Sequence, residues 1–275
     1  MKTLVLKFGG AAVATPERFA SIAHIIEERK KIYPKIAVVV SAMGTTTDDL
    51  LRLATEVHPC PPRREVDMLI SVGERISTAL LAMALDLKMI QAISFTGSQS
   101  GIITSHEHAD AKIVEVRPWR LLPHLDDGKV VIVAGFQGVS RKGEITTLGR
   151  GGSDTTAVAL AVALNAAKVE FYKDVNAIYD VDPKHNPDAK ALSSLSYEEA
   201  IEISEKGAKV LHSRCLYMAN RNKLPLHVLS FHEAQRAKSL VEFDRLGTWV
   251  GEVERGLMEN CVYEEELATE SFSTA

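Results

Sequence analysis

Two short segments of the sequence combine glycines with charged side chains directly before a helical pattern. In the first, Lys7 and Phe8 end a strand-like run and are followed by Gly9 and Gly10. Glycines at a strand-to-helix turn let backbone N–H groups approach phosphate oxygens, and the next helix contributes its positive end. The segment has neither the G-x-x-x-x-G-K-[ST] nor the G-x-G-x-x-G spacing. On its own it therefore indicates a phosphate site and an ordinary turn about equally.

The second segment is Gly-Arg-Gly-Gly-Ser-Asp at positions 149–154, before a long apolar run. The planar guanidinium of Arg150 suits a carboxylate. We expect Ser153 or Asp154 to cap a helix that begins at Thr155, so that its free N–H groups face a ligand in the loop. A carboxylate beside phosphates would be repelled by them, so Asp154 is expected to orient a cation such as Lys7 or Mg²⁺. A solvated loop with an ordinary helix cap is the alternative interpretation.

Two further groups of residues are less specific. The loop after a later strand contains Asp174, Tyr179 and the turn Asp182-Pro183-Lys184. The tyrosine could lie against a planar base, but a loop rich in β-turns is the favoured interpretation. Glu74 and Arg75 interrupt a broad apolar helix face. The two side chains of such a pair are usually solvated or paired with each other. The alternative is contact with a ligand, for example a carboxylate that binds an amino group.

Composition limits the possible classes of protein. The chain has 275 residues, 46% of them hydrophobic, and a formal net charge of −4, which argues against a nucleic-acid binder. Three cysteines lie far apart, so neither a disulfide framework nor a zinc site is expected. No signal-type segment opens the chain, and the apolar stretch 155–167 is shorter than the roughly 20 residues that a membrane span needs. We expect a cytoplasmic protein that binds neither nucleic acid nor membrane.

The elements that must position these residues alternate between strands and helices. Strands are predicted at residues 3–8, 36–40, 90–95, 130–134, 169–173 and 226–230. Thr15 and Pro16 indicate one helix start, and Ser196 with Glu199 forms a capping-box pattern at another. The proline-rich segment 58–67 is expected to be an exposed connection. The order predicts an α/β protein, a three-layer α/β/α sandwich with a mostly parallel central sheet.

Several blocks, in order, resemble the amino acid kinase superfamily and, within it, the aspartate kinases. They are Lys-Phe-Gly-Gly at 7–10, "VVSAMGTTTDDL" from residue 39, "GERIS" from 73, "FTGSQSGIIT" from 95 and "TTLGRGGSDTTA" from 146. The resemblance implies an amino acid kinase fold over residues 1–250, with an N-terminal acceptor lobe and a C-terminal nucleotide lobe. Residues 251–275 are expected to be a partly disordered tail.

The resemblance also implies roles for individual residues. Those implied to be catalytic are Lys7, Asp154 and Lys209. Those implied to bind the substrate are Ser41, Thr47, Glu74, Arg150, Gly151, Gly152 and Ser153. Those implied to bind ATP are Lys7, Phe8, Gly9, Gly10, Lys173, Asp174, Tyr179, Asp182, Lys184 and Lys209. No resident metal site is implied in the protein itself, and Mg²⁺ is expected to accompany ATP.

The implied reaction is the ATP-dependent phosphorylation of the side-chain carboxylate of L-aspartate, the first step toward lysine, threonine and methionine. Two alternatives are a relative that acts on another carboxylate and a non-catalytic nucleotide-binding subunit. The chain departs from the family pattern at Ala11-Ala12, where Thr-Ser is usual, and it ends before the ACT regulatory domains that most aspartate kinases carry. We expect a homo-oligomer that is insensitive to lysine and threonine on its own, with a separate regulatory subunit left open.

Overall fold

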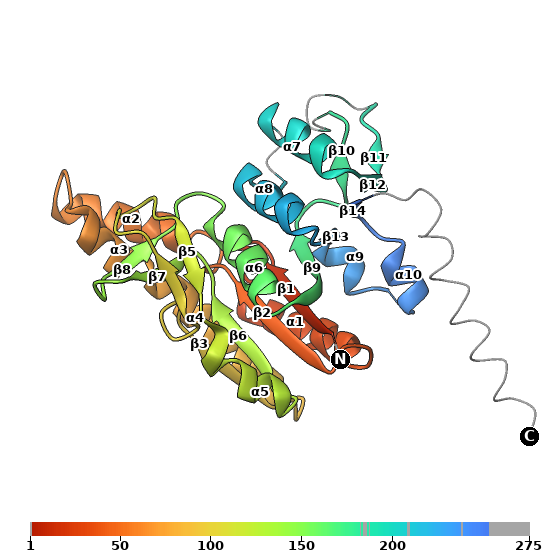
Figure 1. Cartoon of the computed structure of the whole chain (residues 1–275), viewed down its shortest axis with the longest axis horizontal. Coiled ribbons are helices and arrows are strands. Elements are labelled where there is room, and N and C mark those ends of the chain that lie inside the picture. Colours follow the sequence, from red (N-terminus) through yellow and green to blue (C-terminus); the bar gives the residue numbers. More distant parts are fainter. Residues whose placement is uncertain are drawn as a thin grey trace, which may run out of the picture.

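The central feature of the computed structural model is an eight-stranded sheet with the order β12-β14-β13-β9-β1-β2-β6-β3 (Figure 1). The structure describes residues 2–181, 183, 186, 188–207, 210–237 and 239–252. The strands of the sheet are β1 Thr3–Phe8, β2 Lys35–Val40, β3 Ala92–Phe95, β6 Val130–Ala134, β9 Ala166–Lys173, β12 Ser194–Leu195, β13 Leu226–Ser230 and β14 Thr248–Val250. All six strands predicted from the sequence are present. The sheet also includes β14, so it extends to Val250.

The register of the parallel strands brings their carboxyl ends to one edge. Phe8, the last residue of β1, lies opposite Val40 of β2 and Tyr172 of β9. β6 and β13 run parallel to these strands. Ligands of open α/β sheets bind beyond the carboxyl ends of their strands. The residues that follow β1, β2, β6 and β9 are therefore the ones placed for a site.

Helices cover both faces of the sheet, which confirms the predicted three-layer α/β/α sandwich. Alternation along β1 sends Leu4 and Leu6 to one face and Val5 to the other. The first face packs against α1 Pro16–Lys30, α4 Val72–Asp86, α9 Phe231–Ala234 and α10 Leu240–Asp244. The second packs against α5 Leu122–Asp126, α6 Gly152–Ala163, α7 Tyr197–Glu205 and α8 Ser213–Asn222. Lys7 shares the parity of Val5, so it faces α6.

The predicted helix starts were right in two cases and wrong in one. The Ser196 capping box forms as expected, with the Glu199 side chain accepting from the Ser196 N–H at 2.8 Å. α1 begins at Pro16 as predicted, although the Thr15 side chain makes no capping hydrogen bond. α6 begins at Gly152 and not at Thr155. Gly151 occupies the N-cap position with φ of 71°, a left-handed conformation that favours glycine, so the two expected capping residues lie inside the first turn.

A smaller sheet and several short elements were not predicted. The second sheet has the order β5-β4-β7-β8. Its strands are β4 Ile102–Thr104, β5 Ile113–Val116, β7 Gln137–Ser140 and β8 Ile145–Thr147. The other elements are α2 Thr46–Val57, α3 Arg63–Ile70, the 3₁₀ turn Pro118–Arg120 and the hairpin of β10 Ile178–Tyr179 with β11 Ala191–Leu192. Strands of two to four residues carry too little periodicity to be recognised in a sequence.

α3 and α4 bear on two expectations, the exposed connection at 58–67 and the lack of a segment long enough to span a membrane. The segment 58–67 is not wholly an exposed connection, because α3 begins at Arg63 and the Asp67 side chain is fully buried. Together the two helices form the 24-residue stretch Arg63–Asp86, which is long and apolar enough to cross a membrane by composition. In its most apolar window 44% of the residues are buried inside the protein. Packing of α4 against α1 and the sheet explains the hydropathy of the stretch.

A charged network is buried on the opposite face of the sheet, the one that packs against α1. Glu170 of β9 is fully buried and contacts Arg29 of α1 and Lys168, the latter at 3.0 Å. Burial alone would raise the pKa of Glu170, but the charges of Lys168 and Arg29 outweigh it and lower the pKa to about 2. The folded-state pKa is below the ordinary value of 4.5. The network therefore stabilises the fold above that pH and loses this contribution as the pH falls toward 2.

We predict that Glu170→Gln lowers the free energy of unfolding by about 3–5 kcal/mol at pH 7, because it leaves two buried cations with only the more distant, half-exposed Asp244 as an anion. Glu115→Gln is the matched control, since Glu115 also pairs with an arginine, at 2.7 Å, but its side chain is 39% exposed. The control should change stability by at most about 0.5 kcal/mol. Urea denaturation of the three proteins provides the measurement, and equal stabilities would show that the buried network is not stabilising.

Candidate active site

Asp154 lies between two lysines at the carboxyl edge of the sheet. Lys7 Nζ is 2.5 Å from Asp154 Oδ1, and Lys173 Nζ is 2.7 Å from Oδ2. Lys7 is the penultimate residue of β1, Lys173 is the last residue of the neighbouring β9, and the aspartate is in the first turn of α6. Lys7 is 4% exposed and Asp154 is 5% exposed. The sequence prediction that this aspartate orients a cation is therefore met by two cations.

Burial and charge act against each other in this cluster. Burial alone would raise the pKa of Asp154, but the charges of Lys173 and Lys7 together lower it to about 2. Burial lowers the pKa of Lys7, and the attraction of Asp154 opposes this. The aspartate is therefore ionised at neutral pH, and it holds two ammonium groups side by side that would otherwise repel each other.

Close backbone packing brings α6 to this edge. A side chain on Gly135, which follows β6, would place its Cβ 2.8 Å from the Ser153 side chain. A side chain on Gly152 would come within 2.9 Å of Leu148 and Phe136. These glycines allow the first turn of α6 to lie against the strand ends. The glycines of the sequence motif thus serve packing as well as any contact with a ligand.

Two sets of backbone donors remain unpaired near the cluster. In the turn after β1, the Gly9 N–H donates to the Tyr172 carbonyl at 3.3 Å, whereas the N–H groups of Gly10 and Ala11 have no acceptor among the described residues. In α6, the N–H groups of Ser153 and Asp154 likewise have none. Unpaired donors at a helix start and in a glycine turn form an anion site. The arrangement supports the phosphate-binding interpretation of both segments.

Glu74 is a second buried carboxylate, in the first turn of α4. It is 3% exposed, and its Oε1 accepts from the Ala42 N–H at 3.1 Å. Oε2 is buried and has no partner among the described residues. Burial raises the pKa of Glu74 to about 7, against the opposing effects of backbone hydrogen bonds and of Lys7. A carboxylate oxygen left unpaired in this way is suited to bind a cationic group.

The remaining residues implied to bind the acceptor surround this edge with different exposures. Arg150 is exposed and makes no ion pair with any described residue. Ser41 is half-buried, and its N–H donates to the Phe8 carbonyl at 3.2 Å. Thr47 is half-buried in the first turn of α2. Gly151 packs against His212, since a Cβ there would lie 2.4 Å from that residue's side chain. The structure shows no contact of these side chains with Asp154.

The residues implied to bind the nucleotide are only partly brought together. Lys173 belongs to the cluster, whereas the exposed Asp174 and half-buried Tyr179 make no hydrogen bond or ion pair with it. Phe8 is fully buried and stacks on Tyr172, with 4.5 Å between ring centroids, so only its backbone faces the edge. The remaining predictions, at positions 182, 184 and 209 and in the tail beyond 252, fall outside the described residues.

Two residues beside the cluster were given no role in the site by the sequence, although His212 was expected to pack or to cap a helix near the nucleotide lobe. Cys215 is fully buried, its thiol donates to the His212 carbonyl at 3.0 Å, and burial raises its pKa. His212 caps α8, accepting from the Arg214 N–H at 3.2 Å. Neither belongs to a motif of recognisable spacing. Their proximity to Asp154 follows from the packing of α8 on α6, which only the tertiary structure shows.

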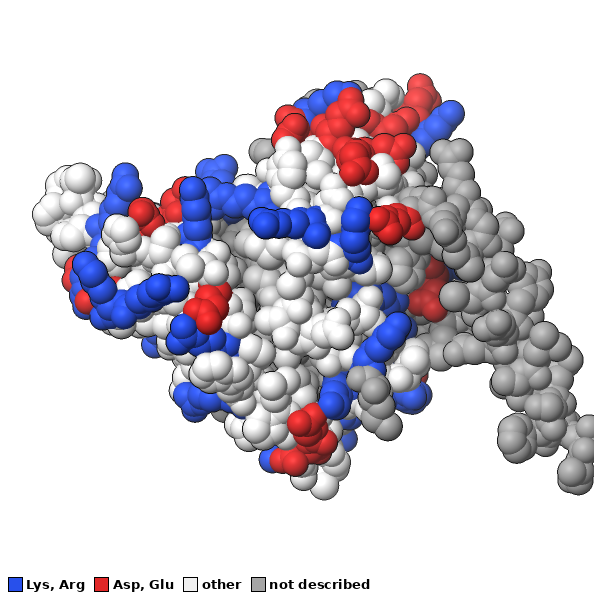
Figure 2. All heavy atoms as spheres, viewed as in Figure 1, with Lys and Arg blue, Asp and Glu red and all other residues white. Residues whose placement is uncertain are grey.

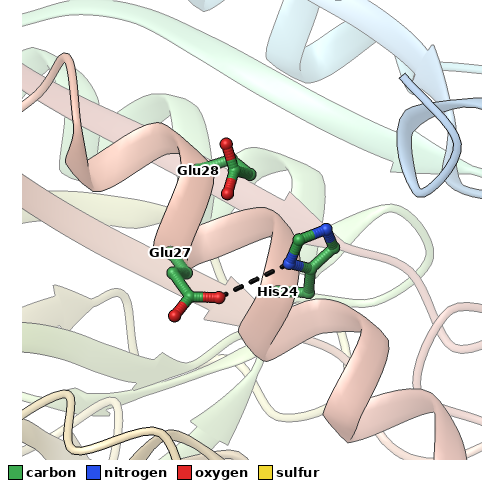
Figure 3. Close-up of side chains that lie close together, drawn as sticks. All are labelled: His24, Glu27 and Glu28. Atoms are coloured by element: carbon green, nitrogen blue, oxygen red, sulfur yellow. Dashed lines mark hydrogen bonds and ion pairs between the residues drawn. The ribbon is translucent and has the colours of Figure 1, made fainter. Parts of the chain in front are cut away.

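Groups far from the strand ends do not compete with this site. His24, Glu27 and Glu28 cluster on the outer surface of α1 (Figure 3), where Glu27 pairs with Lys88 and Glu28 with Lys31. Their carboxylates are therefore already neutralised. Figure 2 shows basic and acidic side chains interspersed on the face it presents, with acidic ones gathered over the lobe that contains α7.

The chain belongs to the amino acid kinase family, whose model matches residues 2–230. The aspartokinase of Mycolicibacterium smegmatis is 54% identical over 231 residues, which are 84% of this chain and 55% of that protein. Aspartate kinase from Synechocystis is 44% identical with a TM-score of 0.77, over 90% of this chain and 39% of that one. The aspartokinase III structure from E. coli, solved with aspartate and ADP, is 29% identical with a TM-score of 0.80, over 91% and 64%. The chain spans about half the length of the curated relatives it matches.

We predict that Glu74 titrates with a midpoint near pH 7, because its carboxyl is buried without a cation against Oε2. Carbon-13 NMR of labelled glutamate δ-carboxyls across pH 4 to 9 follows the titration. The high-pH transition should disappear in Glu74→Gln and remain in Glu107→Gln, whose glutamate is exposed. A Glu74 midpoint at or below the ordinary value of 4.5 would contradict the assigned environment.

Proposed function

We propose that this chain binds ATP and L-aspartate and transfers the γ-phosphoryl group to the side-chain carboxylate, giving 4-phospho-L-aspartate and ADP. The observation that carries the proposal is the buried Lys7–Asp154–Lys173 cluster, which lies beside unpaired backbone donors at the carboxyl edge of the sheet. The related E. coli enzyme was solved with aspartate and ADP, and curated relatives about half identical to this chain are aspartokinases. A cytoplasmic location, where both substrates are soluble metabolites, is part of the same proposal.

The physical difficulty of this reaction is the repulsion between two anions. Unit like charges about 4 Å apart repel by roughly 4 kcal/mol at an intermediate effective dielectric. Lys7 and Lys173 supply positive charge at the strand ends, and the free N–H groups of Gly10, Ala11 and Ser153 supply aligned dipoles. Groups fixed before the substrates bind stabilise the developing charge without reorganising at the moment of reaction. The site thus works by positioning and electrostatics.

The chemistry itself requires no general base. An aspartate side chain has an unperturbed pKa of about 3.9 and is ionised at neutral pH. One of its oxygens attacks the γ-phosphorus while the bond to the oxygen that bridges the β- and γ-phosphates breaks, and ADP leaves with that electron pair. No proton moves. Among the described residues, the ion-pair cluster contains no histidine or other base, and this fits the proposed reaction.

Two groups would hold the acceptor in this proposal. The unpaired Oε2 of Glu74 would accept from the α-ammonium group of aspartate, and the unpaired guanidinium of Arg150 would bind its α-carboxylate. Because the pKa of Glu74 is raised to about 7, binding of an ammonium group by Glu74 strengthens as the pH rises through 7. The two ends of the amino acid would then be bound by groups of opposite charge.

The residues present also fit a magnesium nucleotide. Both oxygens of Asp154 are engaged by lysines, so the described cluster offers an ion few free carboxylate ligands, and the phosphate oxygens would be its main ligands. When bound, Mg²⁺ would supply further positive charge to the triphosphate. Asp154 would contact the ion only if one of the two lysines moved from it to the phosphates.

An acceptor panel tests the proposal directly. We expect ADP release and a hydroxylamine-trapped acyl phosphate with L-aspartate, at a rate at least tenfold above that with L-glutamate or N-acetylglutamate, because the spacing of the two ends must match one side-chain length. A rate highest with another acceptor would instead identify a different amino acid kinase. Nucleotide binding with no transfer to any acceptor would identify a non-catalytic subunit.

We predict that Arg150→Ala raises the KM for aspartate roughly 10- to 100-fold, since it removes charge-assisted hydrogen bonds to a carboxylate. The KM for ATP should stay within about twofold of the wild-type value. Arg141→Ala, at an exposed arginine in the β7–β8 turn, is the control and should leave both constants unchanged. Initial rates with each substrate varied separately give the result, and parallel loss of both affinities would contradict the role of Arg150 as an acceptor clamp.

A further inference from the structure

Asp67 of α3 forms a buried hydrogen-bond centre outside the ion-pair cluster. Its side chain is 0% exposed. The carboxylate contacts His108 Nδ1 at 2.7 Å, and it accepts from the Ala109 N–H at 3.2 Å. It also accepts from the N–H of Thr147 at 3.2 Å and from the Thr147 hydroxyl at 2.6 Å. A carboxylate removed from water is costly unless its oxygens are satisfied, and here four groups satisfy them.

These contacts fasten the segment that leads to Arg150. Thr147 is the last residue of β8 and is fully buried. Its carbonyl accepts from the Ala111 N–H at 2.9 Å, so Thr147 is held by Asp67 on one side and by Ala111 on the other. Beyond it, Gly149 and Gly151 both have φ of 71° and would otherwise leave the backbone free to vary. The geometry of residues 148–151 therefore depends on how firmly Thr147 is held.

The backbone of the 108–111 segment is itself strained. Ala109 has φ of 70°, in the left-handed region that costs a non-glycine residue roughly 1–2 kcal/mol. This conformation accompanies the bond from its N–H to Asp67. Such strain persists only where surrounding contacts determine it, and it is concentrated at functional sites. The structure thus holds an unfavourable conformation at the point where Asp67 meets the Arg150 segment.

α8 holds the same segment from the other lobe. Arg214 Nη1 donates to the Leu148 carbonyl at 3.2 Å, and Nη2 is 2.9 Å from Asp110. Asp110 in turn approaches Gly149, where a Cβ would lie 2.9 Å from its carboxylate. These two residues are substantially exposed, so their ion pair contributes less than the buried carboxylate does. Asp67 is the dominant anchor.

We propose that Asp67 is a positioning residue for the acceptor clamp: through Thr147 it fixes the backbone from which Arg150 reaches the acceptor. This inference rests on the proposed function, because it assigns Arg150 to the acceptor. The Asp67 carboxylate is enclosed by His108, Ala109 and Thr147, so it would act through them and not on a substrate directly. Its loss should therefore weaken binding of the acceptor and leave binding of the nucleotide, which the proposed function assigns to Lys7 and Lys173, unaffected.

The test replaces Asp67 by asparagine, which keeps the size but substitutes an N–H₂ group for one acceptor oxygen. The expected result is a KM for L-aspartate at least tenfold higher, with a KM for ATP within about twofold of wild type. Hydrogen exchange of the 147–151 amides should be at least tenfold faster, and that of β6 unchanged. Glu65→Gln is the matched control on the same helix, since Glu65 is exposed and pairs only with Arg64 among the described residues.

A second pair of variants keeps the proposal falsifiable if Asp67→Asn does not fold. Thr147→Val removes the 2.6 Å hydroxyl bond to Asp67 without removing volume, and Thr147→Ser retains it. We expect an increase of at least threefold in the KM for aspartate with valine and recovery to within twofold of wild type with serine. Equal KM values for aspartate in the valine and serine variants would overturn the proposal. So would an Asp67→Asn protein in which the KM values for aspartate and ATP are both unchanged or rise equally.

Failure of the proposed function gives a different result. If the wild-type protein transfers phosphate to no acceptor in the panel, the proposed function fails. Hydrogen exchange then decides the positioning role by itself, because it needs no turnover. Faster exchange confined to residues 147–151 in Asp67→Asn would support that role, and wild-type exchange there would refute it.

Discussion

The Asp154 carboxylate holds two lysine ammonium groups together in a place from which water is largely excluded. Two buried cations this close would repel each other, and without their shared anion one would lose its charge. With that anion, Lys7 and Lys173 form a fixed positive region at the end of two adjacent strands. The position of α6, the parallel register of β1 and β9 and the glycines that permit close packing are all needed for this one interaction.

The same cluster explains why the two glycine segments belong to one site. Each supplies backbone N–H groups without acceptors among the described residues, and each contributes one member of the ion pair between Lys7 and Asp154. An anion at this point would meet donors from both. Glu74, a few residues beyond the end of α3, adds a carboxylate whose unpaired oxygen could bind a cation. One edge of the sheet therefore offers donors for an anion and a carboxylate for a cation, which suits a substrate that carries both charges.

Much of the fold could be predicted because its main strands are long and apolar. The six runs of β-branched residues became β1, β2, β3, β6, β9 and β13, and the capping box at Ser196 marked a helix start correctly. The second sheet could not be predicted, since its strands have three or four residues and its two halves are joined by the pairing of Ile103 with Val139, which lie far apart in the chain. The start of α6 was placed three residues late because the pattern of capping side chains ignored Gly151, whose left-handed backbone serves as the cap.

The site was predictable where local chemistry determines it. Lys7 and Asp154 stand in segments whose composition already indicated anion binding, and the structure confirms that they meet. Asp67 and His108 could not be found in this way. Asp67 was assigned to an exposed connection, and the pair is separated by 41 positions and formed only by tertiary packing. Residue types and spacing predict contacts along a chain, whereas contacts between distant segments depend on the whole fold.

In the proposed function, Lys7, Lys173 and the N–H groups of the first glycine turn together receive the phosphates of a nucleotide. A crystal structure with a non-hydrolysable ATP analogue and L-aspartate tests this most directly. The account predicts terminal phosphate oxygens within hydrogen-bond distance of Lys7 Nζ and of the Gly10 N–H, with the acceptor carboxylate facing the γ-phosphorus. A triphosphate bound away from the ends of β1 and β9 would contradict it.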